Sequence, residues 1–272
     1  MPRSRGRHPN WGHPDHDACG TGFIAGLHGP ARHEIIQMSL QALERLSHRG
    51  GVDADGASGD GAGLLTSLPV EFFRARAIEE QLYLGELFGV GMLFVPPTRV
   101  GDARAAIEES IGRSKLRMLG WRRVPVNPNS LGQRAFETMP EIWQFFIGPV
   151  SQKTDESSAA KFERSLWLLR KRAETLLPER CYICSLSSRT IVYKGLLTPW
   201  QFPRYYEDLR SPEFTAKFAI FHQRYSTNTQ PSWQLAQPFR YIAHNGEINT
   251  VISNRRWLRA LERDIRKRIG VG

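Results

Sequence analysis

Cysteine is scarce in this sequence, and long apolar runs are absent. The 272 residues contain three cysteines, an odd number that offers no disulfide framework and fits a reducing cytosol. No apolar stretch approaches the roughly 20 residues that a membrane span requires. The sequence therefore argues against a secreted, disulfide-stapled domain and against a membrane-spanning protein, and it predicts a cytoplasmic location.

The cysteines also lack the neighbours that metal ligands usually have. Cys181 and Cys184 have C-x-x-C spacing, but no second cysteine pair and no set of histidines lies nearby. The alternation around them is typical of a β-strand. We expect neither a metal site nor a redox site in this chain.

Acidic residues are outnumbered by basic ones. The chain has 27 Asp and Glu against 37 Lys and Arg, which gives a formal net charge of +10 and raises the hypothesis of nucleic-acid binding. Much of the excess lies in residues 251–272, where Trp257, Leu258 and Leu261 recur at helical spacing. No recognisable nucleic-acid module accompanies this segment, so we interpret it as an amphipathic helix with a solvated basic face.

The glycine- and aspartate-rich residues 53–63 lack the features of two familiar loops. They do not end in the Lys-Ser/Thr pair of a phosphate-binding loop, and no Glu stands at the closing position of a calcium loop. We interpret them as a tight loop that lines a site.

Element order favours an α+β layered domain, because strands and helices come in unequal groups without regular βαβ alternation. Residues 1–18 are rich in Pro, Gly, His and Arg and predict a disordered leader, and residues 19–272 predict one domain. Helices are expected over residues 33–46, 70–80, 104–114 and 159–177. Strands are expected over residues 21–27, 64–68, 88–95, 117–126, 142–147, 218–225 and 239–244, with a hairpin over 182–186 and 190–194.

Cys19 is a candidate nucleophile. It stands between polar residues and a predicted strand, and Gly20 and Gly22 would allow backbone and substrate to approach the sulfur. The alternative, a small buried hydrophobe, is equally compatible with these residues alone. A thiol needs a base, and no His lies in an obvious position to serve. The α-amino group of Cys19 itself would suit, since such amines titrate near pH 7.7–8.0, but only after residues 1–18 are removed.

Two further groups would complete a site for acyl transfer. Arg224 could hold a carboxylate, with hydroxyls from Ser226 and Thr227 adding hydrogen bonds, although a surface salt bridge is the alternative. Asn245 and Gly246 offer two donors for an oxyanion, although Asn-Gly is also a common turn. Together with Cys19 they fit hydrolysis of the side-chain amide of an amino acid.

The motifs around these residues resemble the class II, N-terminal-nucleophile glutamine amidotransferase domain, and within that group the large subunit of glutamate synthase. The resemblance extends from about residue 17 to the terminal helix. The generic motifs are Cys19-Gly20, His222-x-Arg224-x-Ser226-Thr227 and Asn245-Gly246-Glu247-Ile248; the more particular ones are residues 46–51, 58–63, 187–195 and 225–249.

The resemblance implies a four-layer αββα sandwich and cleavage before Cys19. It implies that L-glutamine is hydrolysed to glutamate and ammonia through a cysteinyl thioester. Cys19 would be the nucleophile and, through its amine, the base; Asn245 and Gly246 would form the oxyanion hole. Arg49 and Arg224 would bind glutamine, Arg224 chiefly through the α-carboxylate.

In the intact enzyme of this family, ammonia passes to 2-oxoglutarate at a flavin site. The resemblance therefore implies FMN and an iron–sulfur cluster in the full-length enzyme but no cofactor in this segment, with the remaining synthase domains or subunit as partners. Only 26 residues follow Gly246, and Asp264 matches no family motif, so no residue is assigned to the α-amino group of glutamine. We expect a truncated domain, with an inactive remnant or interaction module as the alternative.

Overall fold

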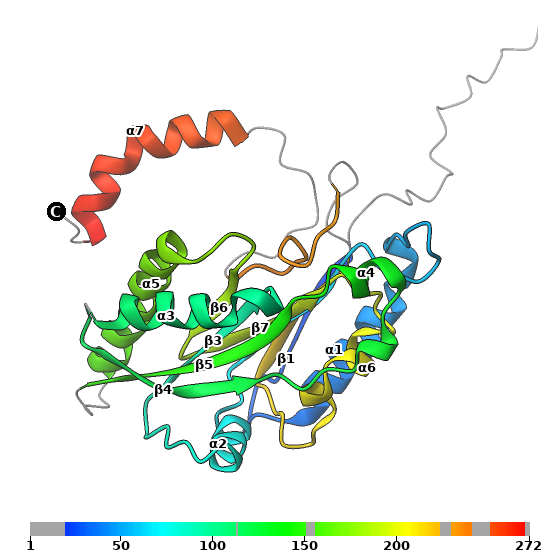
Figure 1. Cartoon of the computed structure of the whole chain (residues 1–272), viewed down its shortest axis with the longest axis horizontal. Coiled ribbons are helices and arrows are strands. Elements are labelled where there is room, and N and C mark those ends of the chain that lie inside the picture. The colour runs from blue at the N-terminus through cyan, green and yellow to red at the C-terminus, as the bar shows by residue number, and fades with distance from the viewer. Residues whose placement is uncertain (1–19, 113, 151–155, 224–229, 241–250, 270–272) are drawn as a thin grey trace, which may run out of the picture.

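The computed structural model describes residues 20–112, 114–150, 156–223, 230–240 and 251–269. Within these ranges the chain forms two four-stranded antiparallel sheets with helices packed around them (Figure 1). The α+β sandwich expected from the sequence is confirmed.

The first sheet brings together strands that are far apart in the sequence. Its order is β1-β8-β2-β7, formed by Gly20–Ala25, Phe218–Gln223, Ala62–Ser67 and Thr190–Gly195. β8 therefore lies between β1 and β2, nearly 200 residues after β1 in the chain. Every pairing is antiparallel.

The second sheet has the order β4-β5-β3-β6, formed by Leu116–Arg123, Glu141–Pro149, Gly89–Val95 and Tyr182–Ser187. β3 is buried along its whole length, which explains its continuous apolar sequence. Its side chains alternate between two cores: Val90, Met92 and Phe94 belong to one, and Leu93 and Val95 to the other.

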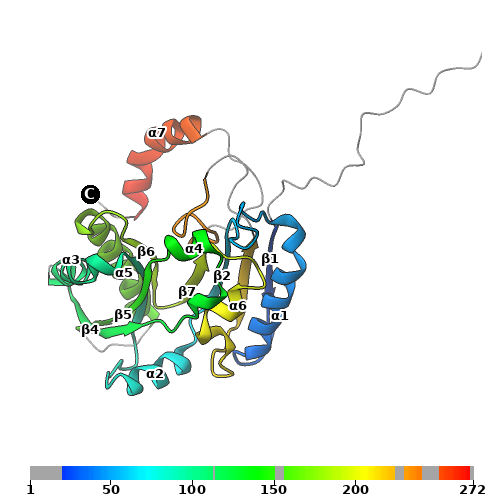
Figure 2. The same cartoon turned by 45° about the vertical axis from the view of Figure 1, so that its right-hand side comes forward.

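Long helices cover the second sheet on the side away from the first. α3 (Val100–Gly112) and α5 (Glu156–Leu176) lie side by side there, as both views show (Figures 1 and 2). Phe162, Leu166 and Leu169 form the buried stripe of α5, in agreement with the helical spacing in the sequence.

The other helices surround the first sheet and the main core. α1 (His33–Arg45) packs against β8 and β1 through a stripe that includes Ile36 and Leu40. Shorter helices complete the shell: α2 (Val70–Glu79), α4 (Gln133–Glu137) and α6 (Phe202–Tyr205), with 3-10 turns η1 (Ser47–Arg49), η2 (Pro97–Arg99), η3 (Pro128–Ser130) and η4 (Glu207–Arg210).

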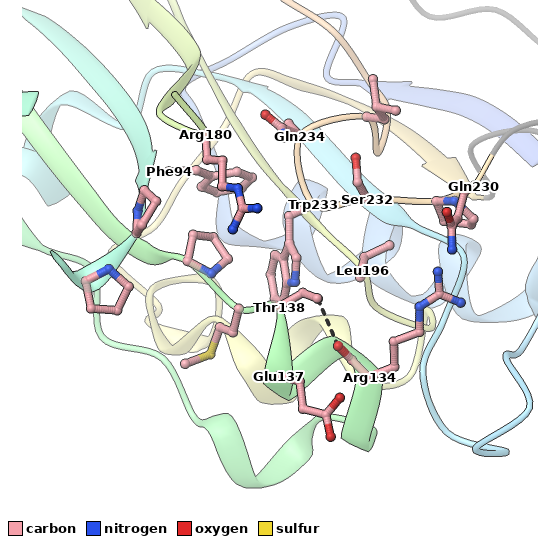
Figure 3. A pocket seen from close by; sticks show the side chains of 16 residues that line it. Phe94, Arg134, Glu137, Thr138, Arg180, Leu196, Gln230, Ser232, Trp233 and Gln234 are labelled. Atoms are coloured by element: carbon pink, nitrogen blue, oxygen red, sulfur yellow. Dashed lines mark hydrogen bonds between the residues drawn. The ribbon is translucent and has the colours of Figure 1, made fainter. Parts of the chain in front are cut away.

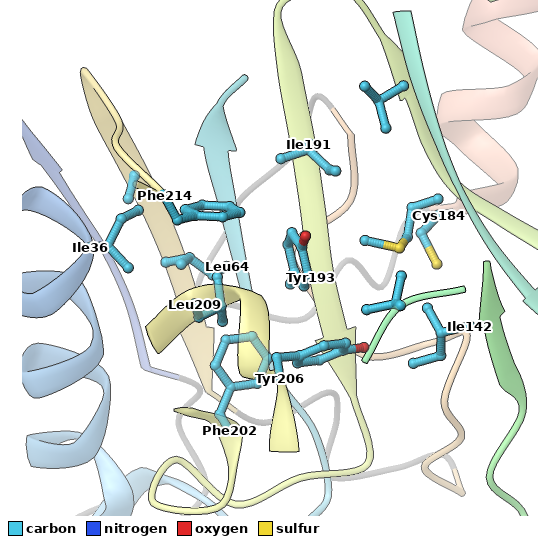
Figure 4. Packing of buried hydrophobic residues seen from close by; sticks show 14 of the residues in the cluster. Ile36, Leu64, Ile142, Cys184, Ile191, Tyr193, Phe202, Tyr206, Leu209 and Phe214 are labelled. Carbon is cyan, nitrogen blue, oxygen red and sulfur yellow. The ribbon is translucent and has the colours of Figure 1, made fainter. Parts of the chain in front are cut away.

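The main core fills the space between these elements. In Figure 4, Tyr193 of β7 lies between Leu64 and Phe214 on one side and Cys184 and Ile142 on the other. The Tyr193 hydroxyl reaches a buried polar network, because it donates to Asp208 at 2.7 Å. The core therefore joins both sheets to η4 through apolar packing and a polar link.

Most predicted elements are present, but the predicted hairpin is wrong. β6 and β7 follow each other closely, yet β6 pairs with β3 and β7 pairs with β2, so the chain crosses between sheets at Ser188 and Arg189. The crossing is held by side chains, since Ser187 Oγ accepts from the backbone N–H of Arg189 and of Thr190. The strand predicted over residues 239–244 lies mostly outside the described residues, and Phe239–Arg240 do not form one.

The predicted amphipathic helix near the end of the chain is confirmed as α7 (Val251–Ile269). Its Trp257 and Leu258 side chains are 69% and 67% exposed. In the part of the chain that the structure describes, no helix combines the length and apolarity needed to cross a bilayer.

Close packing at Gly59 gives a test of the fold. A Cβ at this position would lie 2.3 Å from the carbonyl carbon of Leu197 and 2.4 Å from the backbone nitrogen of Thr198. Because backbone atoms cannot easily move aside, we expect Gly59→Ala to lower the free energy of unfolding by about 2–3 kcal/mol. The control is Gly101→Ala in the first turn of α3, where a Cβ meets nothing within 4 Å, and where Ala should stabilise by about 0.5–1 kcal/mol. The free energies of unfolding are measured by urea denaturation. Equal changes in Gly59→Ala and Gly101→Ala would contradict the close packing described for Gly59.

Candidate active site

Most of the sequence-predicted site residues lie outside the described residues. These are Cys19, Arg224, Ser226, Thr227, Asn245 and Gly246. Arg49 lies within them, in the 3-10 turn η1, and is half-buried. The described residues that adjoin these positions in the sequence show how the surrounding scaffold is built.

The ends of three strands meet at one corner of the first sheet. Gly20, the residue after Cys19, pairs with Gln223, the residue before Arg224. Gln223 also pairs with Ala62 at the start of β2. We call this meeting point, made by Gly20, Gln223, Ala62 and the neighbouring Gly50, the β1–β8 corner.

The turn that carries Arg49 packs against the β1–β8 corner. A Cβ at Gly20 would lie 3.0 Å from Leu46 Cδ1, and a Cβ at Gly50 would lie 1.9 Å from the side-chain nitrogen of Gln223. Gly50 therefore allows the turn to approach the end of β8 closely. The side chain of Gln223 is buried, and its Oε1 has no hydrogen-bond partner among the residues that the structure describes.

The loop of residues 53–63 is held by its own aspartates. Asp55 accepts hydrogen bonds from Ser58 Oγ and from backbone N–H groups, and these bonds lower the pKa of its carboxyl. Asp53 accepts from the N–H of Ala54 and forms an ion pair with Arg134, and both lower its pKa. Since these carboxylates are occupied within the protein, they act as structural groups, and the described residues contain no cluster of three or more His, Cys, Asp or Glu that could hold a metal.

Residues 230–240 pack against α4 and β7. Trp233 is 4% exposed, donates from its Nε1 to the carbonyl of Ala135 at 3.2 Å, and packs where Gly195 leaves space. Beside it lies a cavity of about 770 Å³ between this segment, α4 and the end of β3 (Figure 3). Figure 3 shows Trp233 at the centre of the lining, with Arg134 and Arg180 at opposite sides.

Two buried charges hold residues 230–240 in place, and neither was predicted from the sequence to have a role. Lys194 on β7 donates to the carbonyl of Gln234 at 2.8 Å. Arg240 donates to Glu163 of α5 at 2.9 Å. Burial alone would raise the pKa of Glu163, but hydrogen bonds from Ser188 and Ser187 and the charge of Arg240 lower it. The only sequence signal was that Lys194 is a charged residue in an otherwise apolar strand.

The C-x-x-C pair has the environment of structural cysteines. Cys181 is half-buried just before β6, and Cys184 is buried within that strand, as the sequence predicted. Burial raises the pKa of both thiols, to about 12 for Cys184. Both side chains are therefore protonated thiols near neutral pH, which is unfavourable for nucleophilic attack.

Comparison with known proteins gives consistent matches. The sequence model of the class-II glutamine amidotransferases matches residues 19–270. Ferredoxin-dependent glutamate synthase 2 of Synechocystis is 42% identical over 260 residues, which cover 94% of this chain and 16% of that protein. The glutamate synthase [NADPH] large chain of Bacillus subtilis is 44% identical over 270 residues, which cover 96% and 17%. Ferredoxin-dependent glutamate synthase 1 of Arabidopsis thaliana is 42% identical over 264 residues, which cover 94% and 16%. The chain thus spans about a sixth of the length of these relatives.

Proposed function

The chain belongs to the class-II glutamine amidotransferases, and from this we propose that it hydrolyses the carboxamide of L-glutamine to glutamate and ammonia. The Cys19 thiol would be the nucleophile, and the α-amino group of Cys19 would be the base. Asn245 and Gly246 would donate hydrogen bonds to the oxyanion. Arg49 and Arg224 would bind glutamine, with Ser226 and Thr227 adding hydrogen bonds.

The chemistry proceeds in two acyl-transfer steps. The amine takes the thiol proton, the sulfur attacks the carboxamide carbon, and the negative charge moves to the oxygen. As the tetrahedral species collapses, the amine gives its proton to the leaving nitrogen, so that ammonia departs and a thioester remains. Water then attacks the thioester with the same amine as base, which releases glutamate and restores the thiol.

The β1–β8 corner is the observation that supports this proposal most directly. The residue after Cys19 and the residue before Arg224 are paired across two neighbouring strands. The turn bearing Arg49 packs against the same pair through Gly50. Since consecutive Cα atoms are about 3.8 Å apart, this pairing suits a nucleophile and a carboxylate clamp that act on one glutamine molecule.

We also propose that residues 1–18 are removed, because the amine of Cys19 is free only when the chain begins there. The test of the function is release of ammonia and glutamate from glutamine by the purified chain, with N-terminal sequencing of the same sample. Asparagine, one methylene shorter, should react far more slowly. Absence of glutamine hydrolysis in a folded sample that begins at Cys19 would contradict the proposal.

The relatives' names, glutamate synthases, suggest a destination for the ammonia. We propose that it passes to 2-oxoglutarate in an assembly with further synthase domains or a synthase subunit, in the cytoplasm. FMN and an iron–sulfur cluster would belong to those parts. The described residues offer two cysteines, whereas an iron–sulfur cluster is ordinarily held by four, and we assign neither group to this chain.

Arg49 gives a test of the substrate-binding role. Arg49→Lys is expected to raise the KM for glutamine by about tenfold with a smaller change in kcat, because a planar guanidinium binds a carboxylate or amide oxygen at two points and an ammonium does not. The control is Arg45→Lys on the exposed face of α1. Steady-state hydrolysis kinetics of both variants decide the point. An unchanged KM in Arg49→Lys would remove this residue from the binding site.

A further inference from the structure

Lys194 is an unusual residue to find in the interior of this domain. Its side chain is fully buried, and lysines are almost never so buried unless they are paired. Within the described part of the chain no carboxylate pairs with it. Its Nζ donates to the carbonyl oxygen of Gln234 at 2.8 Å and to the Tyr182 hydroxyl at 3.3 Å. It also lies 4.5 Å from the ring centroid of Phe239 and 4.7 Å from that of Tyr182, within range for cation–π attraction.

These contacts hold residues 234–239 against the first sheet. A Cβ at Gly63 would lie 2.3 Å from the carbonyl oxygen of Gln237 and 3.0 Å from Pro238 Cδ, so the segment crosses the sheet where Gly63 leaves room. Lys194 fixes the segment on both sides of this crossing, through the Gln234 carbonyl before it and the Phe239 ring after it.

The segment crosses the first sheet at Gly63, which belongs to a row of paired residues that leads toward the proposed nucleophile. Gly63 pairs with Lys194 on one side and with His222 on the other, and His222 pairs in turn with Thr21. Paired residues in an antiparallel sheet point to the same face. Thr21 is two residues after Cys19, and His222 is two residues before Arg224.

We propose that Lys194 is a positioning residue of the glutaminase: its ammonium fixes residues 234–239, the segment that precedes Asn245 and Gly246 in the sequence, across the first sheet. This inference rests on the proposed function. An apolar side chain could fill the same space, but it could not donate to the Gln234 carbonyl or attract both rings. The charge is therefore expected to matter for the rate of the reaction beyond its effect on folding.

The protonation state of Lys194 gives this role a signature. Burial lowers the pKa of its ammonium to about 8; the neighbouring Cys184 acts in the opposite direction, and the charge of Arg170 on α5 acts in the same direction as burial. Cys184 and Tyr182 face it from β6, and burial raises the pKa of both, so they stay neutral as Lys194 titrates. His222 lies in the same row beyond Gly63. As the pH rises through about 8, Lys194 loses its charge, which should lower the rate of hydrolysis. The Cys19 amine becomes an unprotonated base over the same range and raises the rate, so the two effects oppose each other in the wild type, and variants without a titrating lysine at position 194 should show only the rise.

Stability should change in the direction opposite to the effect of Lys194 on the rate, over the same range. The pKa of about 8 lies below the ordinary lysine value of 10.5, so the unfolded chain binds more protons between these two pH values. The contribution of Lys194 to the free energy of unfolding therefore rises with pH in that window, because deprotonation relieves the cost of burying the charge. A rate that falls, relative to that of such variants, without a matching loss of stability would separate positioning from folding.

The experiment compares the wild-type chain with Lys194→Met, Lys194→Arg and a control, Lys217→Met, whose lysine is exposed. Glutamine hydrolysis is measured between pH 6.5 and 9.5, with thermal unfolding at each pH. We expect Lys194→Met to lower kcat about tenfold or more at pH 7.5 with KM within about threefold, and to show only the rise with pH. Lys194→Arg should keep kcat within about threefold and also show only the rise, since guanidinium stays charged.

Three outcomes would overturn the proposal. Lys194→Met could lower the melting temperature yet keep the wild-type kcat and pH profile below that temperature, which indicates a structural role only. Lys194→Arg could show the same pH profile as the wild type, which decides the matter even where Lys194→Met does not fold. A folded wild-type chain that begins at Cys19 and hydrolyses no glutamine at any pH would refute the proposed function, and this inference with it.

Discussion

Replacing Cys19 by serine is expected to lower the rate of glutamine hydrolysis about a thousandfold or more. A serine hydroxyl is a far weaker acid than a thiol and is intrinsically less nucleophilic, so the same amine activates it much less effectively. The substrate-binding groups would be unaffected, so glutamine should still protect the variant against thermal unfolding. The measurement is steady-state ammonia release, with the start of the mature chain verified by mass.

Cys181→Ser is the matched control for this experiment. It exchanges the same atoms at a half-buried thiol whose pKa is raised by burial, and hydrolysis should stay within about twofold of the wild type. If Cys19→Ser kept more than a few per cent of the wild-type rate, or if Cys181→Ser lost as much activity, Cys19 would not be the nucleophile.

Replacing Asp208 by asparagine is expected to lower the free energy of unfolding by about 3–5 kcal/mol. Asp208 accepts from Arg122 at 2.7 and 2.9 Å and from Tyr193, and the Arg122 and Asp208 side chains are only 6% and 2% exposed. Gln144 also accepts from Arg122. The variant would leave a guanidinium buried without a counter-charge at the point where the second sheet meets β7 and η4.

An exposed ion pair on the same strand provides the control. Arg123 lies next to Arg122 on β4 and pairs with Glu141 at 3.0 Å, but its side chain is 64% exposed. Arg123→Gln should change the free energy of unfolding by no more than about 1 kcal/mol. Chemical denaturation of both variants at pH 7 makes the comparison. A loss below about 1 kcal/mol in Asp208→Asn would mean that the buried network contributes little to holding the sheets together.

The sequence identified the local elements well because their signals are local. The stripe of Phe162, Leu166 and Leu169 predicted α5, and the apolar run of β3 predicted a strand. The very short helices α4 and α6 carry no comparable repeat and were not predicted. The predicted β6–β7 hairpin was wrong because strand partners depend on segments that are distant in the sequence. β7 pairs with β2, and β6 pairs with β3, so the two neighbouring strands do not pair with each other.

The candidate site was predictable as residue types but not as an arrangement. Nothing local indicates that β8 lies between β1 and β2, although this pairing brings Gly20 and Gln223 together. The close packing of Gly50 against Gln223 could not be predicted either, because the sequence Leu-Ser-His-Arg-Gly-Gly indicates only the end of a helix. The buried position of Lys194 was not predictable either, since an isolated lysine in a strand ordinarily indicates an exposed face.

The aspartates of residues 53–63 illustrate the converse case. Their density predicted a loop that lines a site, and the loop does lie beside the β1–β8 corner, where Asp60 accepts from the N–H of Gly51 at 2.9 Å. Their carboxylates, however, are engaged by Ser58, Ala54 and Arg134. Polar density in a sequence can therefore reflect the hydrogen bonds that a tight turn needs.

The most direct test of this account is to find which atom reacts with an electrophilic analogue of glutamine. The chain is incubated with the analogue, and its mass and labelled peptide are determined, with an excess of glutamine as competitor. We predict one adduct, on the sulfur of a chain that begins at Cys19, and protection by glutamine. An adduct on Cys181 or Cys184, no adduct on a folded chain that begins at Cys19, or hydrolysis by a chain that retains residues 1–18 would contradict it.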